Sequence, residues 1–313
     1  MGDQKIAFLF PGQGSQAVGM GRDLAEKFTV ARDTFAEGDE ALGYSLSKLC
    51  FEGPAEQLKQ TEFTQPAIFA VSMAAYRVLA SRGIQPQIAA GHSLGEYAAC
   101  AAAGVMSFAD ALRALQSRGR FMQEAVPEGE GAMAAVLGLD ADAVRDLCEA
   151  AAKETNQVVS PANLNSPEQV VISGSATGVA RASELAKEKG AKKVVPLQVS
   201  APFHCALMQP AQDRLAEVLN GIKVDDPHFP IVSNVTADVT KKGSRERDLL
   251  IEQVTAPVRW VESMRCMMDR GASTFVEVGP GRVLSGLLRQ IDRAQKCVNV
   301  EDSASLEKTL TGS

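Results

Sequence analysis

The sequence predicts an α/β protein with a large domain built on a parallel sheet and a smaller subdomain inserted into it. First, the apolar run over 5–10 ends in Pro11-Gly12-Gln13-Gly14, which is typical of a buried strand that enters a tight loop. Second, strand-like and helix-like patterns alternate along the chain, as they do where helices cover a parallel sheet. Third, the order of these patterns changes between about 131 and 199.

The large domain is predicted from two stretches of the chain. Before the insertion, the pattern predicts a strand over 5–10, a helix over about 64–82, a strand over 88–90, and helices that follow Ser93 and Ser107. After the insertion, it predicts a helix near 208–219, a strand near 231–234, and a strand-turn-helix over 275–290 around Gly279-Pro280-Gly281. A chain of 313 residues can form one such domain with an insertion.

The insertion is predicted to have the order βαββαβ. Strands are expected over 132–137, 157–161, 169–173 and 192–199, and helices over 141–153 and 176–189. This order is that of a ferredoxin-like unit. Turn-forming residues at 127–131 and at 200–202 mark its ends. We therefore expect a large catalytic domain over 1–127 and 201–313, and a small subdomain over 128–200.

Composition excludes several classes of function. Apolar residues make up 45% and charged residues 22%, and the net charge of −6 argues against general nucleic-acid binding. The longest weakly polar stretch, 97–106, is too short to cross a bilayer, and the N-terminus lacks the pattern of a signal peptide. Six dispersed cysteines without a Cys-x-x-Cys pair predict neither a metal site nor disulfides. The chain is expected to be cytoplasmic, without contact to membrane or nucleic acid.

The candidate nucleophile is Ser93. The segment Gly91-His92-Ser93-Leu94-Gly95 matches G-x-S-x-G between a predicted strand and a predicted helix, which is the context that a nucleophile elbow requires. Because such an elbow is typical of α/β-hydrolases, the large domain is expected to be α/β-hydrolase-like. The N-terminus of the helix offers backbone N–H groups to developing negative charge. The alternative is a serine that only caps the helix.

The candidate base is His204, chosen among three histidines. His92 is adjacent to Ser93, so its side chain is expected to diverge from the nucleophile and to support the site, and His228 lies in a proline-bounded loop. His204 follows the insertion, where it would face a cleft between the two units. Taken alone, it would more often be a structural histidine. No aspartate stands out as the third member of a triad, and a backbone carbonyl could orient the imidazole instead.

Arg118 is the candidate anion-binding residue. On the helix after Ser107, helical spacing places it at the edge of the apolar stripe that contains Leu115 and Met122. A guanidinium near an apolar face needs an anion, and its planar fork suits a carboxylate. An ion pair with an aspartate or glutamate of the protein is the alternative.

Several motifs in the same order resemble the malonyl-CoA:acyl carrier protein transacylase family over nearly the whole chain. They are Phe10-Pro11-Gly12-Gln13-Gly14-Ser15-Gln16, Thr64-Gln65-Pro66-Ala67, Gly91-His92-Ser93-Leu94-Gly95-Glu96, Gln116-Ser117-Arg118-Gly119, Ala162-Asn163-Leu164-Asn165-Ser166-Pro167, Pro202-Phe203-His204, Ser233-Asn234-Val235 and Val278-Gly279-Pro280-Gly281. Residues 241–248 and the segment after Val300 match none of its motifs.

The resemblance implies a role for each matched position. Ser93 would be acylated with His204 as its partner, the backbone N–H groups of Gln13 and Leu94 would form the oxyanion hole, and Arg118 would bind the free carboxylate of malonate. The carbonyl of Gln253 would orient His204. Supporting or pocket-lining roles are implied for Gln65, His92, Asn163 and Asn234. We add that Phe203, beside His204, should narrow the pocket against α-branched acyl groups.

The expected function is a ping-pong transfer of malonyl from malonyl-CoA to the phosphopantetheine thiol of acyl carrier protein, which supplies fatty acid biosynthesis. No metal or other cofactor is expected, and the protein is expected to be a monomer. A serine esterase of the α/β-hydrolase type is one alternative, although such enzymes place the histidine near the C-terminus. A catalytically inactive docking module is the other, and it could use the basic cluster Lys187, Lys189, Lys192 and Lys193, which is also explained as a solvated face.

Overall fold

The large domain is built around a six-stranded sheet. The computed structural model describes residues 5–199 and 201–311, and orders this sheet β10-β9-β1-β2-β7-β8. Neighbouring strands are parallel except for β7 and β8. The strands are β1 (Lys5–Phe10), β2 (Ile88–Gly91), β7 (Ile231–Val232), β8 (Val239–Thr240), β9 (Ala272–Val278) and β10 (Lys296–Val300).

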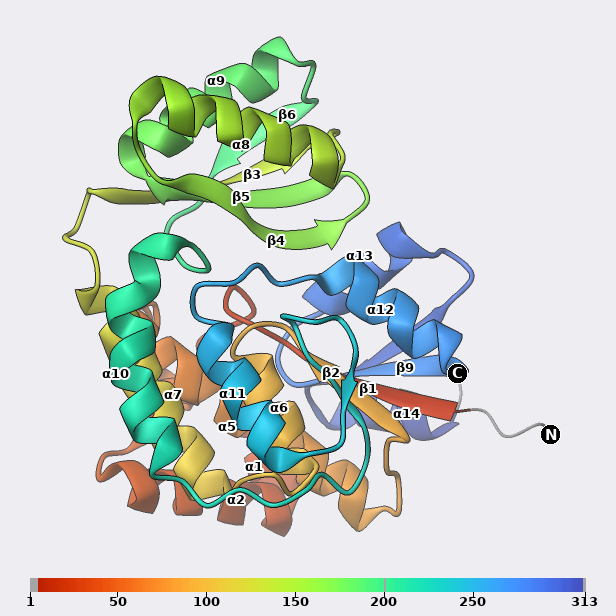
Figure 1. Ribbon diagram of the computed structural model, residues 1–313. Coiled ribbons are helices and arrows are strands. Elements are labelled where there is room, and N and C mark those ends of the chain that lie inside the picture. Colours follow the sequence, from red (N-terminus) through yellow and green to blue (C-terminus); the bar gives the residue numbers. More distant parts are fainter. Residues whose placement is uncertain (1–4, 200, 312–313) are drawn as a thin grey trace.

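Helices cover both faces of this sheet (Figure 1). Along the central strand β1, Phe8 and Phe10 belong to one buried apolar cluster and Ala7 and Leu9 to another. This alternation follows from the two-residue period of a strand, and it buries β1 on both sides. The helices of the domain are α1 (Arg22–Lys27), α2 (Thr29–Leu42), α3 (Leu46–Glu52), α4 (Ala55–Leu58), α5 (Thr61–Ser81), α6 (Gly95–Ala102), α7 (Phe108–Glu124), the 3₁₀ helix Ala206–Met208, α10 (Gln209–Asn220), α11 (Gly243–Glu252), α12 (Trp260–Asp269), α13 (Val283–Ile291) and α14 (Ser303–Thr311).

The small subdomain has the predicted ferredoxin-like order and lies above the large domain in Figure 1. Its four strands form a sheet in the order β4-β5-β3-β6, and all neighbouring strands are antiparallel. Its elements are β3 (Gly131–Leu137), α8 (Ala141–Thr155), β4 (Val159–Ser166), β5 (Gln169–Ser175), α9 (Ala176–Glu188) and β6 (Lys193–Pro196). The predicted two-unit α/β fold is confirmed.

Two predicted strand boundaries in this subdomain are wrong. The strand expected over 157–161 extends instead to Ser166, because Asn163, Leu164 and Ser166 pair with β5 despite the loop-like composition of this segment. The strand expected over 192–199 ends at Pro196, because the chain beyond it turns back toward the large domain, where Leu197 and Val199 line the main cavity. In the large domain, α5 begins at Thr61 rather than at 64.

Strand β4 also joins the small subdomain to the large domain. The N–H of Leu164 donates to the carbonyl of Val258 at 2.9 Å, and the N–H of Val258 donates to the carbonyl of Ala162 at 2.8 Å. The two ends of the subdomain lie side by side, since a Cβ on Gly131 would lie only 2.4 Å from Cδ of Pro202. The two units are therefore joined both by backbone hydrogen bonds at β4 and by the two connecting segments.

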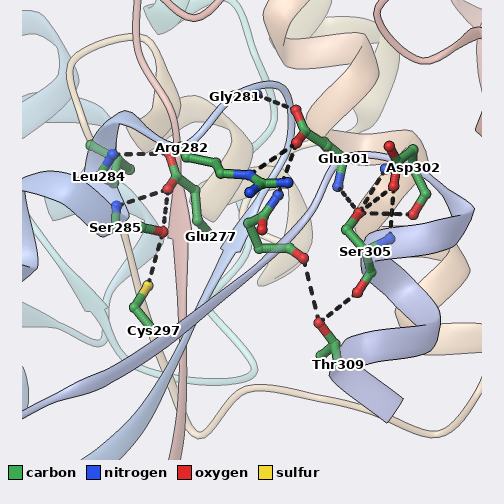
Figure 2. Close-up of polar contacts among 11 residues, drawn as sticks. Glu277, Gly281, Arg282, Leu284, Ser285, Cys297, Glu301, Asp302, Ser305 and Thr309 are labelled. Carbon is green, nitrogen blue, oxygen red and sulfur yellow. Dashed lines mark hydrogen bonds and ion pairs between the residues drawn. The ribbon is translucent and has the colours of Figure 1, made fainter. Parts of the chain in front are cut away.

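The predicted strand-turn-helix near the C-terminal end is confirmed, and a buried carboxylate organises it (Figure 2). Glu277, at the end of β9, accepts the N–H groups of Leu284 and Ser285 at 2.9 and 2.8 Å, and the hydroxyl of Ser285 at 2.6 Å. These N–H groups lie in the first turn of α13, where a helix lacks internal acceptors. Burial raises the pKa of Glu277, and the three donors offset this effect in part.

Within the described ranges, no helix combines the length and apolar character needed to cross a membrane.

Candidate active site

Ser93 lies on a sharp turn between β2 and α6. Its φ of 52° is left-handed, which is unusual for a residue other than glycine. A Cβ on Gly91 would lie 1.9 Å from the backbone of Gly95, and a Cβ on Gly95 would lie 2.2 Å from the carbonyl oxygen of Phe10. Both glycines are therefore required for the close packing of this turn. The capping alternative is wrong, because the N-cap of α6 is Leu94 and no side chain caps the helix.

Asn234 fixes the backbone of this turn from the loop after β7. Its Oδ1 accepts the N–H of Ser93 at 2.7 Å, and its Nδ2 donates to the carbonyl of Gly91 at 2.7 Å. The side chain is fully buried. The side-chain amide of Asn234 thus fixes the backbone at Gly91 and at Ser93.

His204 faces the hydroxyl of Ser93 across the cleft. Its Nε2 lies 2.8 Å from Oγ of Ser93, and its Nδ1 lies 2.9 Å from the carbonyl oxygen of Gln253 and 3.1 Å from that of Ala256. Because carbonyls only accept, Nδ1 carries the hydrogen, which leaves Nε2 free to accept the proton of Ser93. Like Ser93, His204 has a left-handed backbone, with φ 59°.

The imidazole is held in its neutral form. Only 3% of the His204 surface is exposed. Burial, and second the positive charge of Arg118, lower the pKa of His204 to about 3. The base is therefore deprotonated throughout the neutral range.

Arg118 projects from α7 into the same site and is only 1% exposed. Its Nη1 donates to Oε1 of Gln65 at 2.8 Å, and its Nη2 donates to Oε1 of Gln253 at 2.9 Å and to Oγ of Ser93 at 3.1 Å. Within the described residues, no aspartate or glutamate forms an ion pair with it, and its buried Nε has no hydrogen-bond partner. The alternative of a direct structural ion pair is wrong, because the side-chain amides of Gln65 and Gln253 hold this guanidinium.

These side chains line a cavity of about 560 Å³ between the two units. Gln13, Gln65, His92, Asn163 and Phe203 line it together with Ser93, Arg118 and His204. Asn234, Gln253 and Leu94 lie behind this surface, and all three are buried. The apolar part of the wall was not predicted from the sequence and comprises Met122, Met133, Leu197 and Val199. These residues belong to none of the matched motifs, so only the fold identifies them as part of the cavity wall.

The expected oxyanion donors are available. In the part of the chain that the structure describes, the N–H groups of Gln13 and Leu94 donate to no other residue. Gln13 lies in the loop after β1, and Leu94 directly follows Ser93. Two free N–H groups next to a nucleophile are the usual composition of an oxyanion hole.

The other two histidines lie where the sequence places them. His92 turns away from Ser93, with its Nε2 2.8 Å from Oδ1 of Asn165 and its ring 5.3 Å from that of Trp260. It thus connects the large domain to β4 of the small subdomain. His228 is exposed in the loop before β7.

One buried carboxyl group near the site was missed by the sequence analysis. Glu96 is fully buried, and its Oε2 accepts Nε2 of Gln253 at 2.7 Å and the N–H of Asn234 at 3.1 Å. The signal was present, since Glu96 is the one acidic residue in the Ala-rich helix after the motif. In the described ranges, no group of three or more histidine, cysteine or acidic side chains could hold a metal ion.

Comparison with known proteins agrees with this geometry. Residues 7–308 match the acyl transferase domain family. The malonyl CoA-acyl carrier protein transacylase of Bacillus subtilis (strain 168) is 50% identical over 306 residues, covering 98% of this chain and 96% of that protein. The solved structure of the corresponding transacylase from Coxiella burnetii matches with a TM-score of 0.96 at 43% identity, covering 98% of this chain and 97% of that one.

A further solved structure is described as a type II PKS acyl-carrier protein in complex with its malonyl-transacylase. It matches with a TM-score of 0.96 at 46% identity, covering 99% of this chain and 100% of that one. Because the similarity extends over almost the full length in both sequence and structure, the chain belongs to the acyl transferase domain family and, within it, to the malonyl CoA-acyl carrier protein transacylases.

Proposed function

We propose that this protein transfers the malonyl group from malonyl-CoA to the phosphopantetheine thiol of acyl carrier protein, through a malonyl ester on Ser93, and so supplies fatty acid biosynthesis. One observation carries the proposal. The hydroxyl of Ser93 lies 2.8 Å from a neutral imidazole and 3.1 Å from a guanidinium that forms no ion pair with a carboxylate of residues 5–199 or 201–311. A nucleophile, a base and a site for the free carboxylate of malonate therefore meet in one cavity.

In the first half-reaction, Oγ of Ser93 attacks the thioester carbonyl carbon and its proton passes to Nε2 of His204. The N–H groups of Gln13 and Leu94 receive the negative charge of the tetrahedral oxygen. The carbon–sulfur bond then breaks, and the departing thiolate of CoA takes the proton from His204. The carbonyl of Gln253 holds Nδ1–H throughout, so the imidazole needs no carboxylate partner.

The second half-reaction repeats these steps in reverse. The thiol of the carrier gives its proton to His204 and attacks the malonyl ester, and the proton returns to Oγ of Ser93 as the ester breaks. Ester and thioester exchange changes no oxidation state, so we propose that the enzyme needs no metal or redox cofactor. We also propose a cytoplasmic location.

Acyl choice is assigned to Arg118 and Phe203. Arg118, which is held by the side-chain amides of Gln65 and Gln253, would bind the malonyl carboxylate. Its positive charge would distinguish malonyl from acetyl groups, which lack this carboxylate. Phe203 is 8% exposed and lines the cavity next to His204, where its ring would limit bulk at the α-carbon.

A competition experiment tests this assignment. Malonyl-CoA and acetyl-CoA compete for acylation of the native protein and of the Arg118→Ala variant, with products separated by intact mass. We expect the preference for malonyl to fall at least about 30-fold in the variant, because a buried carboxylate would lose its charged partner. Arg120→Ala is the matched control, since Arg120 is exposed on the same helix. An unchanged preference in Arg118→Ala would remove Arg118 from the site.

The two alternatives are separated by incubating the protein with malonyl-CoA and acyl carrier protein and measuring free malonate, malonyl-carrier and the adduct on Ser93. An esterase would release free malonate without acylating the carrier, and a docking module would show no adduct on Ser93. The carbonyl partner of His204 Nδ1 already differs from the carboxylate that the esterase triad uses.

A further inference from the structure

Gln253 contacts both the candidate base and the candidate anion site. Its carbonyl oxygen accepts from His204, whereas Oε1 of its side chain accepts from Arg118 at 2.9 Å. A guanidinium can only donate, so the side-chain amide must present its oxygen, and not its nitrogen, to Arg118. An interaction on the other side of the amide must therefore prevent the rotation that would exchange its oxygen and its nitrogen.

Glu96 is the strongest acceptor on the other side of the amide. Its Oε2 accepts Nε2 of Gln253 at 2.7 Å, which is shorter than the 3.1 Å bond from the same nitrogen to the carbonyl oxygen of Ser93. The same Oε2 accepts the N–H of Asn234 at 3.1 Å. If the amide turned over, an oxygen would face Glu96 and a nitrogen would face Arg118, and both hydrogen bonds would be lost.

A second buried carboxyl group lies behind Glu96. Glu246 on α11 is also fully buried, and it accepts from Sγ of Cys100 at 3.5 Å and from the hydroxyl of Thr240. No lysine or arginine within the described ranges forms an ion pair with either carboxyl group. Burial raises the pKa of Glu96 well above its ordinary value, and the nearby charge of Glu246 raises it further. The cluster acts on Gln253 through Oε2 of Glu96, which accepts from the side-chain nitrogen of Gln253.

We propose that Glu96 is a positioning residue for the reaction: it fixes the side-chain amide of Gln253 so that Arg118 is held ready for a substrate carboxylate. This inference rests on the proposed function. It also explains why the amide of Gln253, with a hydrogen bond on each side, stands between the acidic group and Arg118. A carboxylate in direct contact would occupy the guanidinium that the substrate needs, whereas an amide between them orients Arg118 and leaves its charge free.

The test compares Glu96→Met with Glu96→Gln. Methionine fills a similar volume without an acceptor, so it removes the hydrogen bond that Nε2 of Gln253 donates to Glu96. Glutamine keeps an oxygen for Nε2 of Gln253. We expect the ratio of kcat/KM for malonyl-CoA to kcat/KM for acetyl-CoA to fall at least about tenfold in Glu96→Met. In Glu96→Gln, the ratio should stay within about threefold of the native value.

Two further variants separate positioning from stability. Glu246→Gln changes the same buried cluster without touching Gln253, and it should lower the melting temperature while leaving the ratio native. In a Gln253→Ala background, Glu96→Met should change the ratio by less than about twofold. The side-chain amide through which Glu96 would act on Arg118 is already absent there.

The outcomes decide the inference independently of the proposed function. If Glu96→Met keeps the native ratio, or lowers both kcat/KM values equally, Glu96 is only structural and the inference is overturned. An additive effect in the Gln253→Ala background would overturn it too. Absence of a malonyl adduct on the native protein would instead contradict the proposed function.

Discussion

At the scale of single residues, the electrostatics of His204 are coupled to the expected substrate. Arg118 is one of the two main causes that lower the pKa of His204 to about 3, the other and larger one being burial. A substrate carboxylate bound to Arg118 would neutralise this repulsion and make the imidazolium easier to form. The base would then be strongest when the correct acyl group is in place.

The same pKa gives a prediction for the pH dependence of the acylation step. A histidine whose pKa is lowered stays neutral, and therefore competent as a base, at pH values below 6.5 where a free histidine would be protonated. We expect kcat/KM for acetyl-CoA, which reports the free enzyme, to be flat between about pH 5.5 and 7.5. In Arg118→Ala, the acidic limb should move to higher pH, because one cause of the lowered pKa is removed. A native profile that falls with a midpoint near 6.5 would contradict this assignment.

The candidate nucleophile and base could be named from residue chemistry, whereas the residues expected to act through the backbone could not. Ser93 and His204 followed from the motif and from elimination among three histidines. Gln13, Leu94 and Gln253 entered only through the family resemblance, because a backbone N–H or carbonyl leaves no pattern in the sequence. Glu96 was missed because its partners come from two distant loops.

At the scale of elements, the turn between β2 and α6 is determined by the lack of side chains at its two glycines. A methyl group on Gly95 would meet the carbonyl of Phe10, which belongs to the buried central strand β1 and cannot move aside. The position of the nucleophile is thus set by how closely α6 approaches the sheet.

Gly95→Ala should therefore destabilise the protein by roughly 3 kcal/mol or more, as measured by urea denaturation. Gly286→Ala is the control, since Gly286 also lies in a helix but a Cβ there would meet nothing within 4 Å. Alanine at this exposed helical position should stabilise the fold by roughly 0.5–1 kcal/mol. Equal effects of the two substitutions would show that the close approach at Gly95 is not limiting.

Apolar patterns predicted some of the elements, but helices α2, α11, α12 and α14 were not predicted although they have nine to fourteen residues. Strand β1 and the βαββαβ order followed from apolar patterns. The short helices α1, α3 and α4 were missed, because six, seven and four residues are too few to show a helical period. Strand β10 at the edge of the sheet was missed as well, since only its last residue, Val300, is fully buried.

At the scale of the whole molecule, the cavity lies where the two units meet. The buried apolar residues of the small subdomain, such as Val144, Val170 and Ile172, form a cluster distinct from those of the large domain. The other face of its sheet, with Met133, Ala135, Ala162 and Val171, belongs to a buried apolar cluster of the large domain, and Ser166 Oγ also donates to Gln290 at 2.9 Å. The face that carries Val144, Val170 and Ile172 nevertheless has an apolar core of its own. We therefore propose that 128–200 is a separate domain inserted between 1–127 and 201–313.

This division predicts that residues 128–200 fold without the rest of the chain. The isolated segment keeps all four strands and both helices that enclose its core, so it should show a mixed α/β circular dichroism spectrum and a cooperative thermal transition. The transition should be at low temperature, because so short a chain buries little surface and β4 loses its bonds to Val258. Val144→Asp is the control, since a charge in this core should abolish the transition. If the native segment behaved like Val144→Asp, its core would depend on the large domain, and the cleft that holds Ser93 and His204 would have to form in a single cooperative step.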